Sequence, residues 1–103
     1  MIARIWHGWT TRQNAGAYEK LLREEILLEI ARRNIPGYKG GELFVCEDGD
    51  EVEFITLLRF DSLDAVKTFA GEDYEKPVMH PDARRLVTRF SERSRHYRHV
   101  PIN

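Results

Sequence analysis

The stretch Gly40-Gly-Glu-Leu-Phe-Val-Cys-Glu-Asp-Gly-Asp-Glu-Val-Glu-Phe-Ile-Thr-Leu-Leu-Arg-Phe60 decides the fold, because its pattern predicts two strands joined by a tight turn. A type I′ turn needs positive φ at both central positions, which favours Asp48-Gly49. That turn would pair Val45 with Val52 and Leu43 with Phe54 on a core-like face. The opposite face mixes charged, aromatic and aliphatic residues, in the pairs Cys46/Glu51, Phe44/Glu53, Glu42/Ile55 and Tyr38/Arg59.

Length and composition limit the possible functions. A chain of 103 residues predicts a single domain spanning residues 1-103. Sixteen basic and 17 acidic residues leave a net charge of -1, so we expect no nucleic-acid or membrane partner. The one cysteine, Cys46, excludes an internal disulfide, and without a basic neighbour its thiol should be inert. The chain has no membrane-spanning apolar run and no signal peptide, which predicts a cytoplasmic protein.

The first third of the chain predicts a strand and a long helix. In the strand 2–10, Ala3, Ile5, His7 and Trp9 share one face, and Ile2, Arg4, Trp6 and Gly8 share the other. Thr11 or Asn14 can cap a helix that continues to about Arg33. An apolar stripe at Tyr18, Leu21 and Leu22 is out of phase with a second one at Leu27, Ile30 and Ala31. This mismatch predicts a kink or break near residues 26–28, or a second apolar face that contacts another subunit.

The segments after the hairpin complete the predicted fold. A second helix starts at Asp61 or Ser62 and ends at Gly71, residues 72–80 form a loop, and a helical stretch runs from Pro81 through Phe90. The last strand extends from about Ser91 to Val100. This β-α-β-β-α-β order predicts an α+β, ferredoxin-like fold in which a four-stranded antiparallel sheet carries its helices on one face.

The predicted sheet leaves one face without cover from its own chain. The apolar residues expected there are Tyr38, Phe44, Ile55, Leu57 and Trp6. Burying each such side chain contributes roughly 1.5–3 kcal/mol, so leaving all of them exposed is unfavourable. We therefore predict a homodimer whose two sheets pack face to face.

Several segments together resemble a known family. They are Ala3-Arg-Ile-Trp-His-Gly-Trp-Thr10, Pro36-Gly-Tyr-Lys-Gly40, Asp48-Gly-Asp-Glu-Val-Glu-Phe-Ile-Thr56 and Phe60-Asp-Ser-Leu-Asp-Ala-Val-Lys-Thr-Phe-Ala-Gly-Glu-Asp-Tyr74. The chain resembles the antibiotic biosynthesis monooxygenase-like (ABM) family of dimeric α+β barrel proteins. That family contains cofactor-independent oxygenases, haem-degrading enzymes and proteins of unknown role. The resemblance implies a homodimer that binds a small aromatic or polyketide-like molecule between sheet and helices.

A cofactor-independent oxygenase needs an apolar pocket, a base, and donors that hold an enolate. Trp6, Phe44 and Tyr74 are candidates for the pocket lining. Arg4 or Arg59 could hold the anion, and the candidate bases are His7, His80 and His96. None of the four histidines has the spacing of a metal-ligand motif, and we expect neither a metal nor a cofactor.

Each of these residues also has a structural interpretation. Trp6 suits packing in a barrel or dimer, and Arg59 suits an ion pair with Glu42 or Glu53. His7 suits a structural hydrogen bond, whereas His96 and His99 suit a solvated edge strand.

Three functions therefore stay open. The first is a monooxygenase that uses neither metal nor flavin. The second is a non-catalytic ligand-binding or stress-responsive dimer. The third is a haem-binding relative, since His80 precedes a helix as the haem-ligating histidine of the haem-degrading enzymes does, although their paired His-Lys-His pattern is missing.

Overall fold

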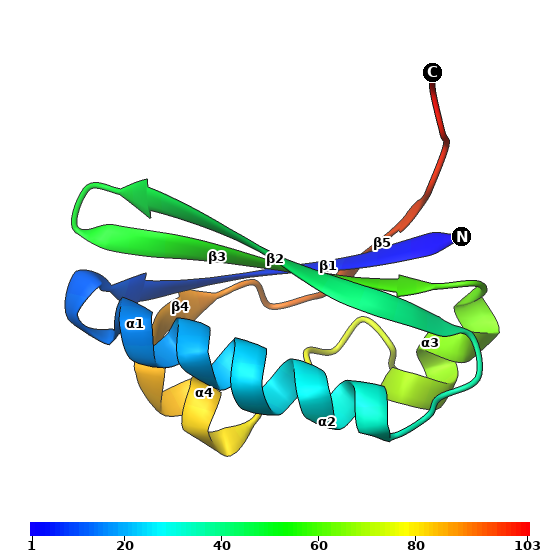
Figure 1. Ribbon diagram of the computed structural model, residues 1–103, viewed down its shortest axis with the longest axis horizontal. Coiled ribbons are helices and arrows are strands. Elements are labelled where there is room, and N and C mark those ends of the chain that lie inside the picture. Colours follow the sequence, from blue (N-terminus) through cyan, green and yellow to red (C-terminus); the bar gives the residue numbers. More distant parts are fainter.

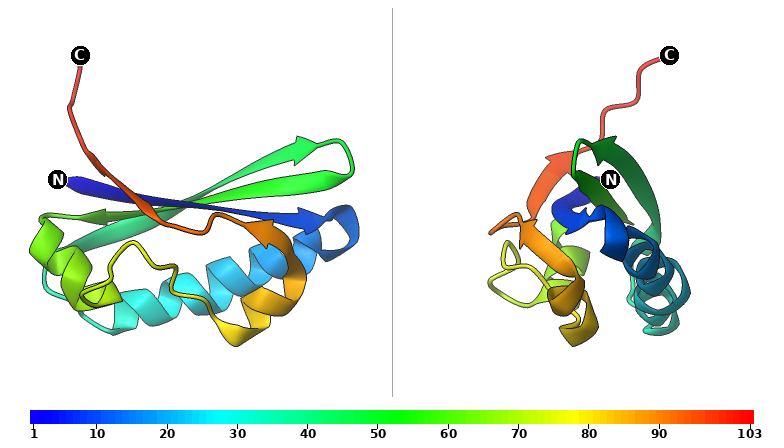
Figure 2. Two further views of the ribbon diagram at one scale, coloured as in Figure 1. Left: turned by 180° about the vertical axis from the view of Figure 1, so that it is seen from behind. Right: turned by 90° about the vertical axis from the view of Figure 1, so that its left-hand side faces the viewer.

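The computed structural model describes residues 1–103 and has two layers, an antiparallel sheet and a layer of helices (Figure 1). The strands are β1 (Ile2–Thr11), β2 (Tyr38–Asp48), β3 (Glu51–Phe60), β4 (Val87–Phe90) and β5 (Arg95–Arg98). The helices are α1 (Arg12–Leu21), the π-helical η1 (Leu22–Ile26), α2 (Leu27–Arg32), α3 (Leu63–Ala70) and α4 (Pro81–Leu86). All helices lie on the same side of the sheet (Figure 2). None of them is long and apolar enough to cross a membrane.

The sheet confirms the predicted α+β class, and its strand order is consistent with the ferredoxin-like pattern. The order is β2-β3-β1-β4, and β5 also pairs with β1. Strand β4 pairs with β1 at Gly8–Thr10 and β5 pairs with it at Ile2–Ile5, so the two together act as one interrupted edge strand. The prediction of helix through Phe90 is wrong, because residues 87–90 pair with β1 instead. The sheet consequently has five strands rather than four.

The central hairpin has its predicted faces but a different register. Its turn lies at Gly49-Asp50 rather than Asp48-Gly49, and only Gly49 has positive φ, at 64°. Positive φ at the first central residue alone is typical of a type II′ turn, which favours Gly there. Val45 therefore pairs with Phe54 rather than with Val52. Since the pairing shifts by two residues and side chains alternate with period two, the residues of the hairpin after Gly40 keep their predicted faces.

A bulge at the start of β2 corrects the predicted position of Tyr38. The register shifts between Tyr38 and Gly40, where Gly40 has a φ of 113°. Tyr38 consequently pairs with Phe60, and the centroids of the two rings are 5.5 Å apart. Its ring packs against the core on the helix side, so the prediction that Tyr38 lies on the uncovered face is wrong.

The long helix contains the predicted irregularity, one turn earlier than expected. The residues facing the sheet recur every four positions, at Tyr18, Leu22, Ile26 and Ile30. An α-helix has 3.6 residues per turn, so such a stripe would rotate away from the sheet. The wider π turn at residues 22–26 restores the phase and leaves Glu25 and Glu29 exposed, which resolves the mismatch in the sequence.

The core between sheet and helices consists of two clusters. The first cluster contains Ile30, Ile35, Leu58, Phe60, Ala65, Val66 and Phe69. The second contains Tyr18, Leu21, Leu22, Val52, Phe54 and Ala83. The clusters share no buried residue, and the space between them holds the candidate site.

Candidate functional site

A cavity lies under β1 between the two core clusters. The space open to the centres of water-sized molecules is about 60 Å³. One water needs roughly 10–15 Å³ by such a measure, and pockets for drug-sized ligands reach roughly 300–1,000 Å³. The cavity therefore suits a molecule of about one ring, and a haem does not fit. Ten of its 14 lining residues are hydrophobic; the others are Arg4, Thr56, His80 and Ser94.

Arg4 is the charged group of the cavity and has no acidic partner. It is only 4 % exposed, and this burial lowers the pKa of its guanidinium to about 10. Its hydrogen bonds go to the backbone oxygens of Tyr74 and Lys76, and its carbon Cζ lies 5.4 Å from the centroid of the Phe69 ring. Buried cations are ordinarily paired with an anion. Arg4 thus presents an uncompensated positive charge to an apolar cavity.

His96 supports Arg4, although the sequence suggested that it was solvated. Nη1 of Arg4 lies 3.0 Å from Nε2 of His96. A guanidinium can only donate, so Nε2 must accept and the imidazole must be neutral. Burial and the charge of Arg4 both lower the pKa of His96, with Glu75 opposing them. His96 thereby helps to hold the guanidinium in place.

This coupling predicts a pH dependence of stability that comes from His96. Because the pKa of His96 is lower in the folded chain than its ordinary value of 6.5, the unfolded chain binds the proton first as the pH falls. The contribution of His96 to stability is therefore present above pH 6.5 and is lost as the pH falls toward the folded pKa. The substitution His96→Gln keeps an acceptor that does not titrate, so it should flatten the decline in urea-unfolding free energy between pH 7 and 5.

The exposed His99 provides the control for this experiment. His99→Gln changes a histidine whose side chain is exposed, and it should leave the wild-type decline unchanged. If His96→Gln shows the same decline as the wild-type chain, then His96 does not carry the effect.

His80 reaches the cavity as a donor rather than as a base. It caps α4, where its Nδ1 accepts a hydrogen bond from the backbone nitrogen of Asp82 at 3.1 Å. With the lone pair of Nδ1 occupied, the neutral ring carries its proton on Nε2. His80 can therefore donate to a ligand in this state, and it could accept a proton only by giving up the cap.

Trp6 and Tyr74 lie near Arg4 in different ways. Trp6 lines the cavity and donates from Nε1 to the backbone oxygen of Ser91 at 2.9 Å. The prediction that Trp6 belongs to the uncovered face is wrong, because β1 pairs with β3 so that Trp6 lies opposite Thr56, on the helix side. Tyr74 does not line the cavity, but its backbone oxygen anchors Arg4 and its ring contacts that of His96 edge-on at 5.2 Å.

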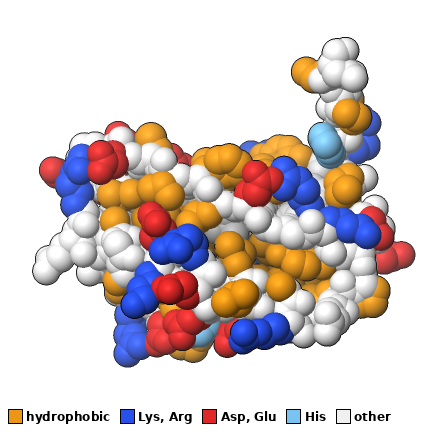
Figure 3. All heavy atoms as spheres, in the orientation of Figure 1, with side chains coloured by type: hydrophobic (Ala, Val, Ile, Leu, Met, Phe, Trp, Pro, Cys, Tyr) orange, Lys and Arg blue, Asp and Glu red, His pale blue; other side chains and the backbone are white.

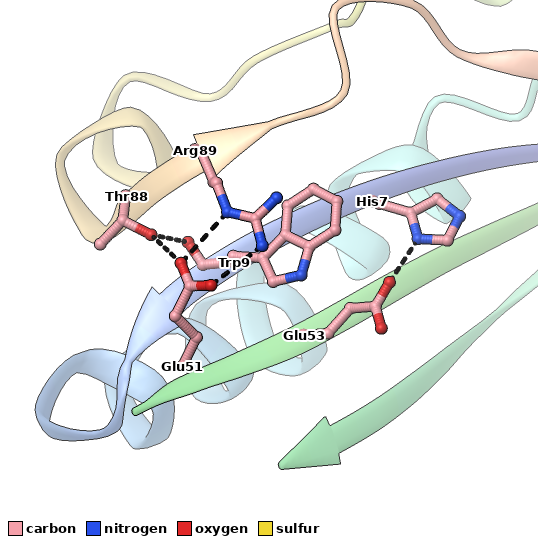
Figure 4. Close-up of polar contacts among 6 residues, drawn as sticks. All are labelled: His7, Trp9, Glu51, Glu53, Thr88 and Arg89. Carbon is pink, nitrogen blue, oxygen red and sulfur yellow. Dashed lines mark hydrogen bonds and ion pairs between the residues drawn. The ribbon is translucent and has the colours of Figure 1, made fainter. Parts of the chain in front are cut away.

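The remaining candidates lie on the opposite face of the sheet and cannot line this cavity. His7 and Glu53 point toward each other, with Nδ1 and Oε2 2.6 Å apart (Figure 4). Arg59 forms the ion pair with Glu42 that the sequence suggested. Phe44 is 46 % exposed there, so the prediction that it lines the same pocket as Trp6 is wrong.

The ring of Trp9 lies beside the His7–Glu53 pair, stacked on His7 with ring centroids 5.9 Å apart. The guanidinium of Arg89 stacks over Trp9, 4.0 Å from the ring centroid, and Glu51 holds Arg89 through two hydrogen bonds of 2.9 and 3.2 Å (Figure 4). Hydrogen bonding between these two side chains lowers the pKa of Glu51 and raises the pKa of Arg89. This face therefore presents ordered pairs rather than a free charge.

The structure thus brings Arg4, Trp6 and His80 together at one cavity and separates them from His7, Arg59 and Phe44. Sequence reasoning missed Tyr18 and Ser94, which also line the cavity, and the role of His96. The alternation of the last strand could have placed His96 on the side of Arg4. Nothing marked Tyr18, because its ring fits the apolar stripe of its helix.

Neither the charges on the face drawn in Figure 3 nor a group of metal ligands marks a second site. Lys, Arg, Asp and Glu side chains alternate with hydrophobic ones over the visible face (Figure 3). No group of three or more His, Cys, Asp or Glu residues could hold a metal ion. Comparison of the chain with protein-family models, with curated proteins and with solved structures finds no match.

Proposed function

We propose that this chain binds a small, single-ring aromatic anion in the cavity between sheet and helices and oxygenates it without a metal or flavin, as a homodimer of the ABM-like kind. The observation that carries the proposal is the buried guanidinium of Arg4, which opens on an apolar cavity and has no carboxylate partner. A phenolate, enolate or carboxylate would supply the missing negative charge. The sequence resemblance to the ABM-like family supports the same class of ligand.

The chemistry requires only that the ring be activated as an anion. A deprotonated quinol has an electron-rich ring carbon that can form a bond to O₂. Cleavage of the O–O bond then leaves one oxygen on the ring and releases the other as water, so that C₆H₆O₂ and O₂ give hydroxyquinone, C₆H₄O₃, and H₂O. Both oxygen atoms are reduced by electrons from the quinol. Arg4 would stabilise the anion in a low-dielectric site, where such stabilisation is strong.

The side chains around Arg4 would complete the site. His80 offers a hydrogen-bond donor at the cavity, and Trp6 offers a flat apolar wall for the ring. Residues 78–79, which come from the segment between α3 and α4, also line the cavity. A polycyclic, polyketide-like ligand would require this segment to move, so a single ring is the better substrate.

Oxygen consumption tests this function. Wild-type protein should consume O₂ with hydroquinone faster than buffer, and with ¹⁸O₂ the hydroxyquinone should carry one labelled oxygen. Arg4→Met should return the rate to the buffer background. Binding of a single-ring anion without oxygen consumption would instead favour the non-catalytic ligand-binding function.

The homodimer is supported by the uncovered face of the sheet. Phe44 is largely exposed there, beside half-buried Ile5, Ile55 and Leu57. Ion-paired and stacked side chains surround these apolar residues, as around the core of an interface between two proteins. A second copy of the sheet, packed face to face, would bury this region.

The substitution Phe44→Glu should weaken the dimer, because it would place a carboxylate in the apolar centre of the interface. We expect the dimer dissociation constant, measured by sedimentation equilibrium, to rise roughly tenfold or more. The matched control is Val45→Glu, since Val45 is 47 % exposed, nearly the same as Phe44, but points to the helix side of the same strand. A strictly monomeric wild-type chain at micromolar concentration, or equal effects of both substitutions, would contradict the face-to-face dimer.

A further inference from the structure

The hydroxyl of Tyr18 is a further polar group at the cavity. Tyr18 is 1 % exposed, and its ring packs edge-on against Phe54 with centroids 4.9 Å apart. The residue lines the cavity, and its hydroxyl makes no hydrogen bond within the chain. The fully enclosed side-chain oxygen without a partner is that of Thr10, so the hydroxyl of Tyr18 keeps surface open to the cavity and can donate to a group that enters it.

The surroundings of Tyr18 place this hydroxyl at one end of the cavity. A methyl group added at Gly8 would lie 3.3 Å from the hydroxyl oxygen and 3.3 Å from the Trp6 ring. The hydroxyl therefore lies under Gly8 and next to the indole. Burial also raises the pKa of Tyr18 to about 12, so the hydroxyl is neutral at physiological pH and can donate a hydrogen bond.

Arg4 marks the other end. Arg4, Trp6 and Gly8 alternate on the helix side of β1, and a strand rises about 3.3 Å per residue, so Arg4 and Gly8 lie roughly 13 Å apart along the strand. Trp6 lies between them in the strand, and its ring reaches the position of Gly8. The cavity thus offers a cation at one end, a phenol at the other and the aromatic ring of Trp6 in its wall.

We propose that the cavity selects a single-ring anion that carries a second oxygen opposite its anionic group, with the anion on Arg4 and the distal oxygen hydrogen-bonded to Tyr18. This selectivity rests on the proposed function, because Arg4 must first hold the anion. Tyr18 adds a preference between ligands, whereas Arg4 determines whether any of them binds.

Calorimetric titration with two matched pairs of probes tests the selectivity. The pairs are benzoate with 4-hydroxybenzoate, and phenylacetate with 4-hydroxyphenylacetate. In at least one pair the hydroxylated compound should bind wild-type protein about tenfold more tightly, the effect of one neutral hydrogen bond in a dry site. Tyr18→Phe should remove that preference while changing the affinity for the unhydroxylated partner by less than about twofold.

The variants separate the two proposals. Arg4→Met should weaken all four probes, and the control Tyr97→Phe, which alters an exposed tyrosine of β5, should change none. Tyr18→Phe removes no hydrogen bond of the free chain, so its melting temperature should equal that of wild type. Equal wild-type affinities within both pairs, or a preference that survives Tyr18→Phe, would overturn only the role of Tyr18. Failure of all four probes to bind would overturn the proposed function together with this selectivity.

Discussion

Replacing Arg4 with methionine is expected to weaken the binding of phenylacetate by roughly 30-fold or more, because truncating one partner of a buried charge pair costs about 2–5 kcal/mol. Methionine preserves the unbranched apolar stem but offers no charge, so the carboxylate would enter a dry cavity unpaired. Titration calorimetry at pH 7 measures the effect directly. The affinity of Arg4→Lys for phenylacetate should fall between those of wild type and Arg4→Met. Lysine keeps the charge but loses the planar array of donors that Tyr74, Lys76 and His96 orient.

A second arginine supplies the control for this experiment. The guanidinium carbon of Arg33 lies 5.2 Å from the centroid of the same Phe69 ring, but Arg33 is exposed and does not line the cavity. Arg33→Met should therefore change the affinity for phenylacetate by less than about twofold. Equal losses in the two variants would mean that the cavity charge of Arg4 does not bind the anion.

Replacing Phe60 with alanine is expected to lower the unfolding free energy by about 3–5 kcal/mol, the usual cost of removing a buried aromatic side chain. Phe60 is completely buried and is the contact between the rings of Tyr38 and Phe69, at 5.5 and 5.6 Å. A domain of this size has roughly 5–15 kcal/mol of stability, so the variant should lose a large part of it. Urea titration followed by circular dichroism measures the change.

The control for Phe60→Ala is a substitution at Val45, on the same side of the hairpin. Val45→Ala also shortens an apolar side chain on the helix-facing side of the sheet, but Val45 is 47 % exposed, on the edge strand β2. The loss should remain below about 1 kcal/mol. A similar loss in both variants would show that helix cover does not determine which residues of this sheet face are buried.

Local chemistry in the sequence was sufficient for most of the elements. Thr11 and Ser62 cap helices as their side chains predict, and Gly71 ends α3 with a φ of 92°. The mismatch between the two apolar stripes of the long helix correctly indicated an irregularity. These features depend on contacts between residues close in the chain, which is why the sequence is informative about them.

The hairpin register and the last strand depended on more distant contacts. The turn lies one residue later than predicted, because its geometry needs positive φ only at Gly49. Residues 87–90 form a strand because the edge of β1 was available to pair with them. The helix α4, which contains Arg84 and Leu86, ends where that pairing begins, at Val87. Backbone pairing with a remote strand thus overrode the local pattern.

By itself, the sequence determined the α+β class, the two faces of the hairpin and the limits of most helices, because alternation and capping act over a few residues. Only the tertiary structure decided which face of β1 meets the helices, since large residues such as Trp6 and Trp9 occur on both. Pairing with β3 turned Arg4 and Trp6 inward and His7 outward. That one choice placed an unpaired buried cation at the same cavity as Tyr18, in the gap between two core clusters that no local pattern could reveal.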